Sequence, residues 1–328
     1  MGVPPRTLGR SGIEVSAIGF GAWAIGGPYY AADGTAVGWG EVNDDESVAA
    51  LRRAVELGIT FIDTADSYGA GHSERIIGRA FAGRRDEVVI ATKFGNVFDE
   101  SRRVLTGIDV SPEYIRRACR ASLDRLGTDH IDLYQLHIGE MPLERVDETI
   151  ATLEDLVAEG LIRAYGWSTD DPERAAAFAK GPHCATVQNQ MNVFDDAPEM
   201  LAVCDAHDLA SINRGPLAMG LLTGKYDATS RLPGDDVRGA SPAWMTYFTG
   251  GRPNPEFLAR LDAVREILAS GGRTLAQGAL GWLLARSGRT VPIPGIRTVA
   301  QAEQNAGALR HGPLTAGQLT EIDSLLRR

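Results

Sequence analysis

Short apolar runs alternate along the chain with longer stretches in which apolar residues recur every three or four positions. The runs predict buried strands at residues 17–20, 59–63, 88–92, 131–137, 164–168, 185–188, 210–213 and 291–293. The longer stretches predict helices from residue 43 or 44 to 55, and at 73–81, 112–126, 146–159, 172–179, 198–206, 275–285 and 299–309. Eight strands, each followed at some distance by a helix, indicate βαβ units around a parallel sheet. This count favours a closed (β/α)₈ TIM barrel of the α/β class over an open sheet.

Three further segments lie outside this alternation. Residues 6–16, with a glycine-rich turn at 9–12, predict a short N-terminal β-hairpin, and residues 319–326 predict an extra C-terminal helix. Residues 226–255 contain many glycines and prolines together with Trp244, Tyr247 and Phe248, which favours a partly ordered lid. A length of 328 residues fits either two ordinary domains or one large barrel. We expect one barrel domain over residues 1–328, because the candidate site residues must reach a single site.

Composition narrows the classes of partner. The formal net charge of −10 argues against electrostatic binding of nucleic acid or of an anionic membrane by the protein as a whole. A local phosphate-binding pocket remains compatible with this charge. No apolar run approaches the roughly 18 residues of a membrane span, and the N-terminus lacks the apolar region of a secretory signal. We therefore expect a soluble cytoplasmic protein.

Two other signals are set aside. The three cysteines and the histidines show no metal-ligand spacing, so no metal is expected. Gly19-Phe-Gly21-Ala-Trp23-Ala24 resembles a dinucleotide fingerprint, but alanine stands at the third glycine. Gly26-Gly27-Pro28 also prevents a helix from opening there, so a Rossmann domain is not expected.

Polar residues close five of the predicted strands: Asp63, Lys93, His137, Ser168 and Gln188. In a (β/α)₈ barrel the active site lies at the C-terminal ends of the strands, so these side chains should converge. Tyr68 follows Asp63 by five residues and should reach the same mouth. One polar strand end often reflects only the approach to water, whereas recurrence at five strands indicates a site.

These residue types fit the reduction of a carbonyl group. Tyr68 can donate a proton to a developing alkoxide, and the ammonium of Lys93 should lower the pKa of Tyr68 from its ordinary value near 10. A buried lysine needs a counter-charge, which Asp63 can supply. His137 can donate a hydrogen bond to the carbonyl oxygen of the substrate.

The chain resembles the aldo-keto reductase superfamily over nearly its whole length. The resemblance rests on ordered motifs: Gly58-Ile-Thr-Phe-Ile-Asp-Thr-Ala-Asp-Ser-Tyr-Gly69, Ala91-Thr-Lys93, Asp132-Leu-Tyr-Gln-Leu-His137, Gly166-Trp-Ser168, Gly220-Leu-Leu-Thr-Gly-Lys225 and Pro292-Ile-Pro-Gly295 through Asn305. It implies a (β/α)₈ barrel that binds NADPH and transfers a hydride to an aldehyde or ketone. The catalytic positions that it implies are Asp63, Tyr68, Lys93 and His137.

The same resemblance implies where the cofactor and substrate lie. Cofactor contacts are expected at Gly21, Trp23, Asp63, Ser168, Gln188, Arg214, Pro216, Leu217, Lys225, Gly295, Arg297, Gln301, Gln304 and Asn305, and substrate contacts at Trp23, Tyr68 and His137. Arg297 is expected to bind the 2′-phosphate of NADP. Three positions depart from the family's pattern. Thr169 replaces an asparagine, Arg214 replaces a tyrosine that stacks on the nicotinamide, and Gln304 replaces a glutamate.

Two functions of different classes follow from these features. The first is an NADP-dependent oxidoreductase that reduces a small-molecule aldehyde or ketone, or oxidises the corresponding alcohol or sugar, with Tyr68 as general acid and base. The alternative is a cofactor-sensing accessory subunit of a membrane complex with little turnover. A barrel hydrolase that needs no nicotinamide is a third interpretation. The physiological substrate, the direction of reaction and the oligomeric state do not follow from the sequence.

Overall fold

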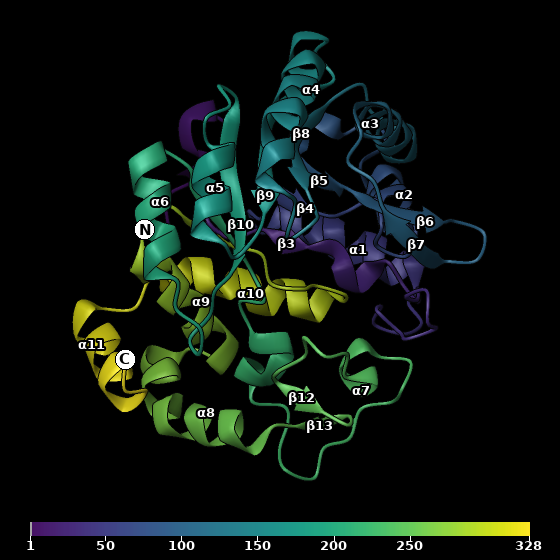
Figure 1. Ribbon diagram of the computed structural model, residues 1–328. Coiled ribbons are helices and arrows are strands. Elements are labelled where there is room, and N and C mark those ends of the chain that lie inside the picture. Colours follow the sequence, from purple (N-terminus) through teal and green to yellow (C-terminus); the bar gives the residue numbers. More distant parts are fainter. Residues whose placement is uncertain (1) are drawn as a thin grey trace.

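A ring of parallel strands forms the centre of the molecule, and helices cover the outside of the ring (Figure 1). This computed structural model describes residues 2–328. The strands follow one another in the sheet in chain order: β3 (Phe20–Gly21), β4 (Phe61–Asp63), β5 (Val89–Phe94), β8 (Ile131–Leu136), β9 (Ile162–Ser168), β10 (Cys184–Gln190), β11 (Ala210–Arg214) and β14 (Thr290–Pro292). The predicted (β/α)₈ architecture is confirmed.

Backbone hydrogen bonds close the ring between β3 and the end of β14. The amides of Gly19 and Gly21 donate to the carbonyls of Pro292 and Pro294, each at 2.9 Å. A Cβ atom at position 21 would lie 2.6 Å from the carbonyl oxygen of Ile293, so only glycine permits this approach. The first and last strands of the barrel therefore meet at a residue without a side chain.

The outer helices begin where the sequence supplies caps. The side chain of Asn43 accepts from the amide of Glu46 at the start of α1, and Ser111, Asp171 and Thr298 cap α3, α5 and α10 in the same way. The bounds are α1 (Asp44–Glu56), α2 (His72–Phe81), α3 (Pro112–Leu126), α4 (Val146–Ala158), α5 (Pro172–Phe178), α6 (Pro198–His207), α9 (Leu275–Arg286) and α10 (Val299–His311). All eight predicted helices are present, with ends shifted by one or two residues.

The barrel interior is filled by apolar side chains from several of the strands. Phe61, Ala91, Leu133, Ala164 and Ile212 belong to one buried cluster inside the ring. The N-terminal hairpin, β1 (Arg6–Thr7) and β2 (Glu14–Val15), contributes Leu8, Ile13 and Val15 to the same cluster. The predicted hairpin therefore closes the end of the barrel at which the strands begin.

Several elements are additions to the barrel. A second hairpin, β6 (Asn96–Asp99) and β7 (Val104–Ile108), follows β5 and was not predicted. Residues 226–255 are ordered around α7 (Val237–Ala240), β12 (Phe248–Thr249) and β13 (Arg252–Pro253), and they lie below the barrel in Figure 1. Helices α8 (Pro255–Leu268) and α11 (Ala316–Leu325) pack beside them. The chain also forms short 3₁₀ helices: η1 (Gly9–Ser11), η2 (Ala22–Ile25), η3 (Arg85–Glu87), η4 (Leu143–Arg145), η5 (Ala218–Thr223) and η6 (Ser270–Gly272).

Candidate functional site

The alternation of side chains along the strands carries polar residues to the mouth of the barrel. Phe61 and Ala91 lie in the interior cluster, so Asp63 and Lys93, two residues further along β4 and β5, point the same way. Leu133 of β8 is also interior. Residues two apart share a face of the strand, so Gln135 also faces inward, and His137 follows two residues later at the mouth. The predicted convergence of strand-end side chains is present in the structure.

A buried ion pair forms the base of the site. The ammonium of Lys93 donates to Oδ1 of Asp63 at 2.6 Å and to the backbone carbonyl of Thr64 at 2.7 Å. The side chains of Lys93 and Asp63 are 0% and 2% exposed, so neither charge is solvated by bulk water. Oδ2 of Asp63 accepts from the amides of Gln188 at 2.8 Å and Gln135 at 3.1 Å. Every Asp63 oxygen thus has a fixed donor.

Tyr68 lies above this pair in the loop after β4. Its hydroxyl oxygen accepts from Nζ of Lys93 at 3.4 Å, which leaves the phenolic proton free for another acceptor. The loop is held by a close approach of two glycines: the ideal Cβ of Gly69 would collide with the carbonyl oxygen of Gly26, and the φ angle of Gly69 is +62°. The backbone itself therefore fixes the height of Tyr68 over Lys93.

The acidity of Tyr68 differs from the expectation drawn from its residue type. Burial raises the pKa of Tyr68, and the carboxylate of Asp63 raises it further, while Arg214 opposes them. The expected lowering of the Tyr68 pKa is wrong in this geometry, because burial and the Asp63 carboxylate dominate and the Lys93 ammonium lies closer to Asp63 and Thr64 than to Tyr68. Tyr68 is consequently held in its protonated form at neutral pH.

His137 stands beside Tyr68, directly after β8. The two rings meet edge to face, with centroids 5.7 Å apart. Burial lowers the pKa of His137 well below 6.5, and the charges of Lys93 and Arg214 lower it further. Its imidazole is therefore neutral at pH 7 and carries a single N–H.

A cluster of tryptophans packs beside the Tyr68 ring. Trp23 stacks on Tyr68 with centroids 6.0 Å apart, and Trp39 and Trp244 pack against Trp23 at 5.2 and 6.3 Å. Nε1 of Trp23 donates to the hydroxyl of Tyr29 at 2.9 Å, which fixes the indole. Trp244 is 55% exposed, so residues 226–255 place one large aromatic ring at the edge of the site.

The predicted nicotinamide contacts lie close to the ion pair. Ser168 ends β9 and is directly opposite Gln188 in the parallel register. The Gln188 amide is already bonded to Asp63 and also reaches Oε1 of Gln135 at 3.4 Å. Thr169, at the position where the family pattern has asparagine, donates its hydroxyl to the carbonyl of Gly139 at 3.0 Å. The replacement at position 169 therefore bonds to the neighbouring loop.

Arg214 ends β11 at the same mouth. It donates to Oε1 of Gln190 at 3.2 Å and forms an ion pair with Asp170. The chain then turns through Gly215, Pro216 and Leu217 into η5, where Ala218, Met219 and Gly220 have positive φ angles of 47°, 55° and 95°. Lys225 follows as an exposed residue, with its ammonium 4.9 Å from the ring centroid of Tyr226.

The predicted adenosine-phosphate residues gather around the start of α10. Gly295 forms a bridge with Gly21, so this segment begins at the barrel rim. The Arg297 guanidinium donates to the backbone carbonyl of Trp39 at 3.1 Å and to that of Glu41, and the Arg297 amide donates to Oε1 of Gln301 at 2.8 Å. Gln304 is half-buried, and Asn305 is buried on the same helix. Arg297 bonds the Trp39 carbonyl, and the Trp39 ring packs against Trp23, which stacks on Tyr68. Because Tyr68 accepts from Lys93, this series of contacts connects the start of α10 to the Lys93–Asp63 ion pair.

Three polar residues of the mouth were not predicted. Gln135 binds Asp63, and Asp170 and Gln190 hold Arg214. Gln135 precedes His137 by two residues, so strand periodicity contained a usable signal for it. Asp170 follows the end of β9 and Gln190 is the last residue of β10, and only the folded structure shows that both bind Arg214.

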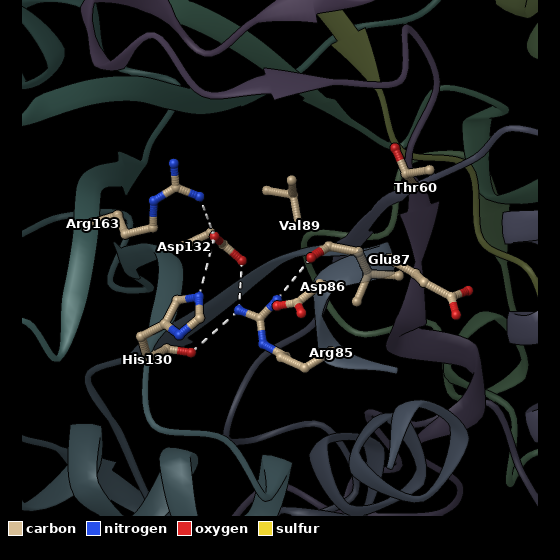
Figure 2. A pocket seen from close by; sticks show the side chains of 9 residues that line it. Thr60, Arg85, Asp86, Glu87, Val89, His130, Asp132 and Arg163 are labelled. Atoms are coloured by element: carbon tan, nitrogen blue, oxygen red, sulfur yellow. Dashed lines mark hydrogen bonds and ion pairs between the residues drawn. The ribbon is translucent and has the colours of Figure 1, made fainter. Parts of the chain in front are cut away.

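A separate cavity of about 310 Å³ lies at the opposite end of the barrel, where the strands begin. Figure 2 shows Arg85, Arg163 and His130 arranged around the carboxylate of Asp132. Asp132 accepts from Arg85 at 2.6 Å, from Arg163 at 2.7 Å and from the amide of Ile90 at 2.8 Å. Polar groups at this face of a (β/α)₈ barrel serve stability, and here they fasten β5 to β8 and β9.

Two further properties concern the described residues. Within residues 2–328, no helix combines the length and the apolar character that crossing a membrane requires. The same residues contain no group of three or more His, Cys, Asp or Glu side chains arranged to hold a metal ion.

Comparison with known proteins gives one consistent result. The family model described as Aldo/keto reductase family matches residues 17–327. The uncharacterized oxidoreductase YqkF of Bacillus subtilis is 37% identical over 321 residues, which cover 97% of this chain and 95% of the relative. An NADP(+) aldo-keto reductase, yakc of Schizosaccharomyces pombe, is 32% identical over 94% of this chain and 88% of its own length.

Solved structures agree with the sequence relatives. The glycerol dehydrogenase AKR11B4 from Gluconobacter oxydans superimposes with a TM-score of 0.79 at 31% identity, covering 96% of this chain and 93% of that one. An aldo-keto reductase from Klebsiella pneumoniae in complex with NADPH has a TM-score of 0.69 at 30% identity, covering 99% and 96%.

Proposed function

The chain belongs to the aldo/keto reductase family, and on that premise we propose that it reduces a small aldehyde or ketone with NADPH, using Tyr68 as the proton donor. The observation that carries this proposal is the Tyr68 hydroxyl. It accepts a hydrogen bond from Lys93 and keeps its own proton, and the Tyr68 ring lies against both His137 and the indole of Trp23. A carbonyl oxygen beside Tyr68 and His137 would meet two neutral donors.

The residues at the mouth fit an NADPH molecule. Arg297 and Lys225 are cations suited to phosphates, and the N-terminus of α10 adds its partial positive charge. The left-handed residues 218–220 turn the chain sharply after β11, as phosphate-binding loops do. Relatives that bind NADP(+) or NADPH match nearly the whole chain, which supports the same cofactor here. When bound, NADPH would supply the hydride.

Each of the polar side chains around Tyr68 then has a defined role in carbonyl reduction. Tyr68 donates its proton to the carbonyl oxygen as negative charge develops there. His137, neutral because burial lowers its pKa, donates a hydrogen bond to the same oxygen and orients it. Lys93 donates a hydrogen bond to the Tyr68 oxygen, Asp63 holds Lys93 in place, and Gln135 and Gln188 hold Asp63. In the reverse direction, the same tyrosine would receive the proton of an alcohol.

The mouth also supports one domain as the functional unit. Trp39 near the N-terminus and Arg297 near the C-terminus are joined by a hydrogen bond, and Asp236 of the long loop bridges to Trp39. These contacts bring segments that are far apart in the sequence together at the mouth, which supports one domain.

Steady-state turnover tests the proposal. The purified protein is incubated with NADPH and a panel of aliphatic, aromatic and sugar-derived aldehydes and ketones, and loss of the reduced nicotinamide is followed by absorbance. We expect saturable turnover with at least one class of carbonyl compound. Tight binding of NADPH with no turnover on any compound would instead favour a cofactor-sensing role.

A further inference from the structure

Arg214 is a cation at the mouth of the barrel that the proposed reduction chemistry does not use. Its guanidinium is held by acceptors from two neighbouring strand ends: Oε1 of Gln190, the last residue of β10, and the carboxylate of Asp170, just after β9. Both acceptors are themselves fixed. The Gln190 amide donates to Asp195 at 3.1 Å and to the hydroxyl of Tyr247 at 3.2 Å, and the Gln190 backbone amide donates to Asp170 at 2.6 Å. The positive charge therefore has a defined place.

The charge of Arg214 acts on the residues that carry the chemistry. Burial is the largest cause of the lowered pKa values of His137 and Lys93, and Arg214 acts in the same direction on both; Arg214 also opposes the rise that burial produces in the pKa of Tyr68. A group that exchanges a hydride with a carbonyl held by Tyr68 and His137 must enter this same field. The Arg214 and Asp170 side chains are 38% and 54% exposed. Solvent therefore weakens the attraction between the two charges, and each charge can still act on a third group nearby.

The two forms of a nicotinamide cofactor differ in charge at the ring. The oxidised ring is a cation, whereas the reduced ring is neutral, and the phosphates are the same in both forms. A nearby guanidinium repels the oxidised ring, and a nearby carboxylate attracts it. We infer that the Arg214–Asp170 pair sets the ratio of affinities for the oxidised and reduced cofactor, with Arg214 favouring NADPH and Asp170 limiting that preference. This inference rests on the proposed function.

The test is a set of charge substitutions read out by binding. Dissociation constants for NADP⁺ and for NADPH are measured by isothermal titration calorimetry on each folded variant. Arg214→Gln should lower the ratio Kd(NADP⁺)/Kd(NADPH) by about fivefold, and Asp170→Asn should raise it by about fivefold, the scale of a partly exposed charge interaction. Arg214→Lys, which keeps the charge, should leave the ratio within about twofold of the original.

Two controls separate this effect from general damage to the site. Asp171→Asn removes a carboxylate from the adjacent residue, which caps α5 and pairs with Arg174, and should leave the ratio unchanged. Arg297→Ala should weaken both cofactor forms by a similar factor, because the phosphates do not change with oxidation state. By linkage, the equilibrium between bound oxidised and bound reduced cofactor should shift by the same factor as the ratio.

The measurements distinguish failure of the proposed function from failure of the proposed role of the Arg214–Asp170 pair. If the unsubstituted protein binds neither form of the cofactor, the proposed function fails. If it binds both but Arg214→Gln and Asp170→Asn leave the ratio unchanged, or move it in the same direction, the inference about the charge pair is overturned and the proposed function stands.

Discussion

The buried pair of Lys93 and Asp63 allows stability and chemistry to be separated in one experiment. Lys93→Met removes the ammonium and leaves Oδ1 of Asp63 without its partner at a position that is 2% exposed. Breaking a buried ion pair by removing one partner costs about 3–5 kcal/mol. Because Gln135 and Gln188 still donate to Oδ2, we expect a loss near the lower end, about 3 kcal/mol in the free energy of unfolding.

The double variant Asp63→Asn/Lys93→Met removes both charges. The asparagine side chain introduced by Asp63→Asn keeps an oxygen for the two glutamine amides, so we expect this variant to recover about 2 kcal/mol relative to Lys93→Met. Turnover should not recover, because the Tyr68 hydroxyl still lacks the Lys93 donor, and kcat should stay at least about a hundredfold below that of the unsubstituted enzyme. Stability is measured by urea unfolding followed by circular dichroism, and turnover by NADPH oxidation.

A surface pair supplies the matched control for this cycle. Arg265 bonds Asp262 at 2.8 Å with side chains that are 44% and 69% exposed, so Arg265→Met should change the unfolding free energy by less than about 0.5 kcal/mol. The reasoning is refuted if the double variant is no more stable than Lys93→Met. It is also refuted if turnover returns together with stability.

Three further predictions concern titration and phosphate recognition. The pKa of His137 lies below its ordinary 6.5, so below pH 6.5 the unfolded chain takes up a proton that the folded protein does not, and stability falls as pH drops. His137→Gln should therefore flatten the dependence of Tm on pH between 6.5 and about 5; an unchanged slope would contradict the buried neutral imidazole. Burial and the nearby Glu74 raise the pKa of the Asp66 carboxyl well above 3.8. The contribution of Asp66 to folding stability therefore becomes less favourable as pH rises above 3.8. Asp66→Asn should raise Tm by about 2 °C or more at neutral pH and by less near pH 4, in scanning calorimetry; the opposite order would count against a protonated Asp66. Arg297→Ala should raise the Kd of NADPH at least about tenfold more than that of NADH, and equal losses in a fluorescence titration would exclude a role at the 2′-phosphate.

The barrel was predictable because its strands are short apolar runs, and five of the eight predicted strands end in a polar residue. Strands buried on both sides leave continuous apolar segments, such as residues 88–92, and closure follows from their number and their helical connections. The hairpin of β6 and β7 was missed because its residues are half-buried or exposed, so no apolar run marks it. Helix α8 was missed although Asn254, Pro255 and the spacing of Leu261, Val264 and Leu268 contain an ordinary helix signal.

The site was predictable at the level of residue type and less so at the level of partners. Asp63, Lys93, Tyr68 and His137 converge as expected, because strand periodicity and barrel geometry determine where they point. Which donor binds which oxygen depends on distances across the barrel. The Gln188–Asp63 bond and the Gln190 and Asp170 contacts of Arg214 therefore appear only in the folded chain. The pKa of Tyr68 was misjudged because sequence alone does not show how deeply Tyr68 is buried, and burial is the largest cause of the rise in its pKa.

Replacement of Tyr68 by phenylalanine tests the central claim most directly. Tyr68→Phe removes one oxygen atom and leaves the ring that stacks on Trp23. With the carbonyl compound that the unsubstituted enzyme turns over best, kcat should fall at least about a hundredfold while the Kd of NADPH stays within about twofold. Undiminished turnover by Tyr68→Phe would contradict the assignment of Tyr68 as the proton donor.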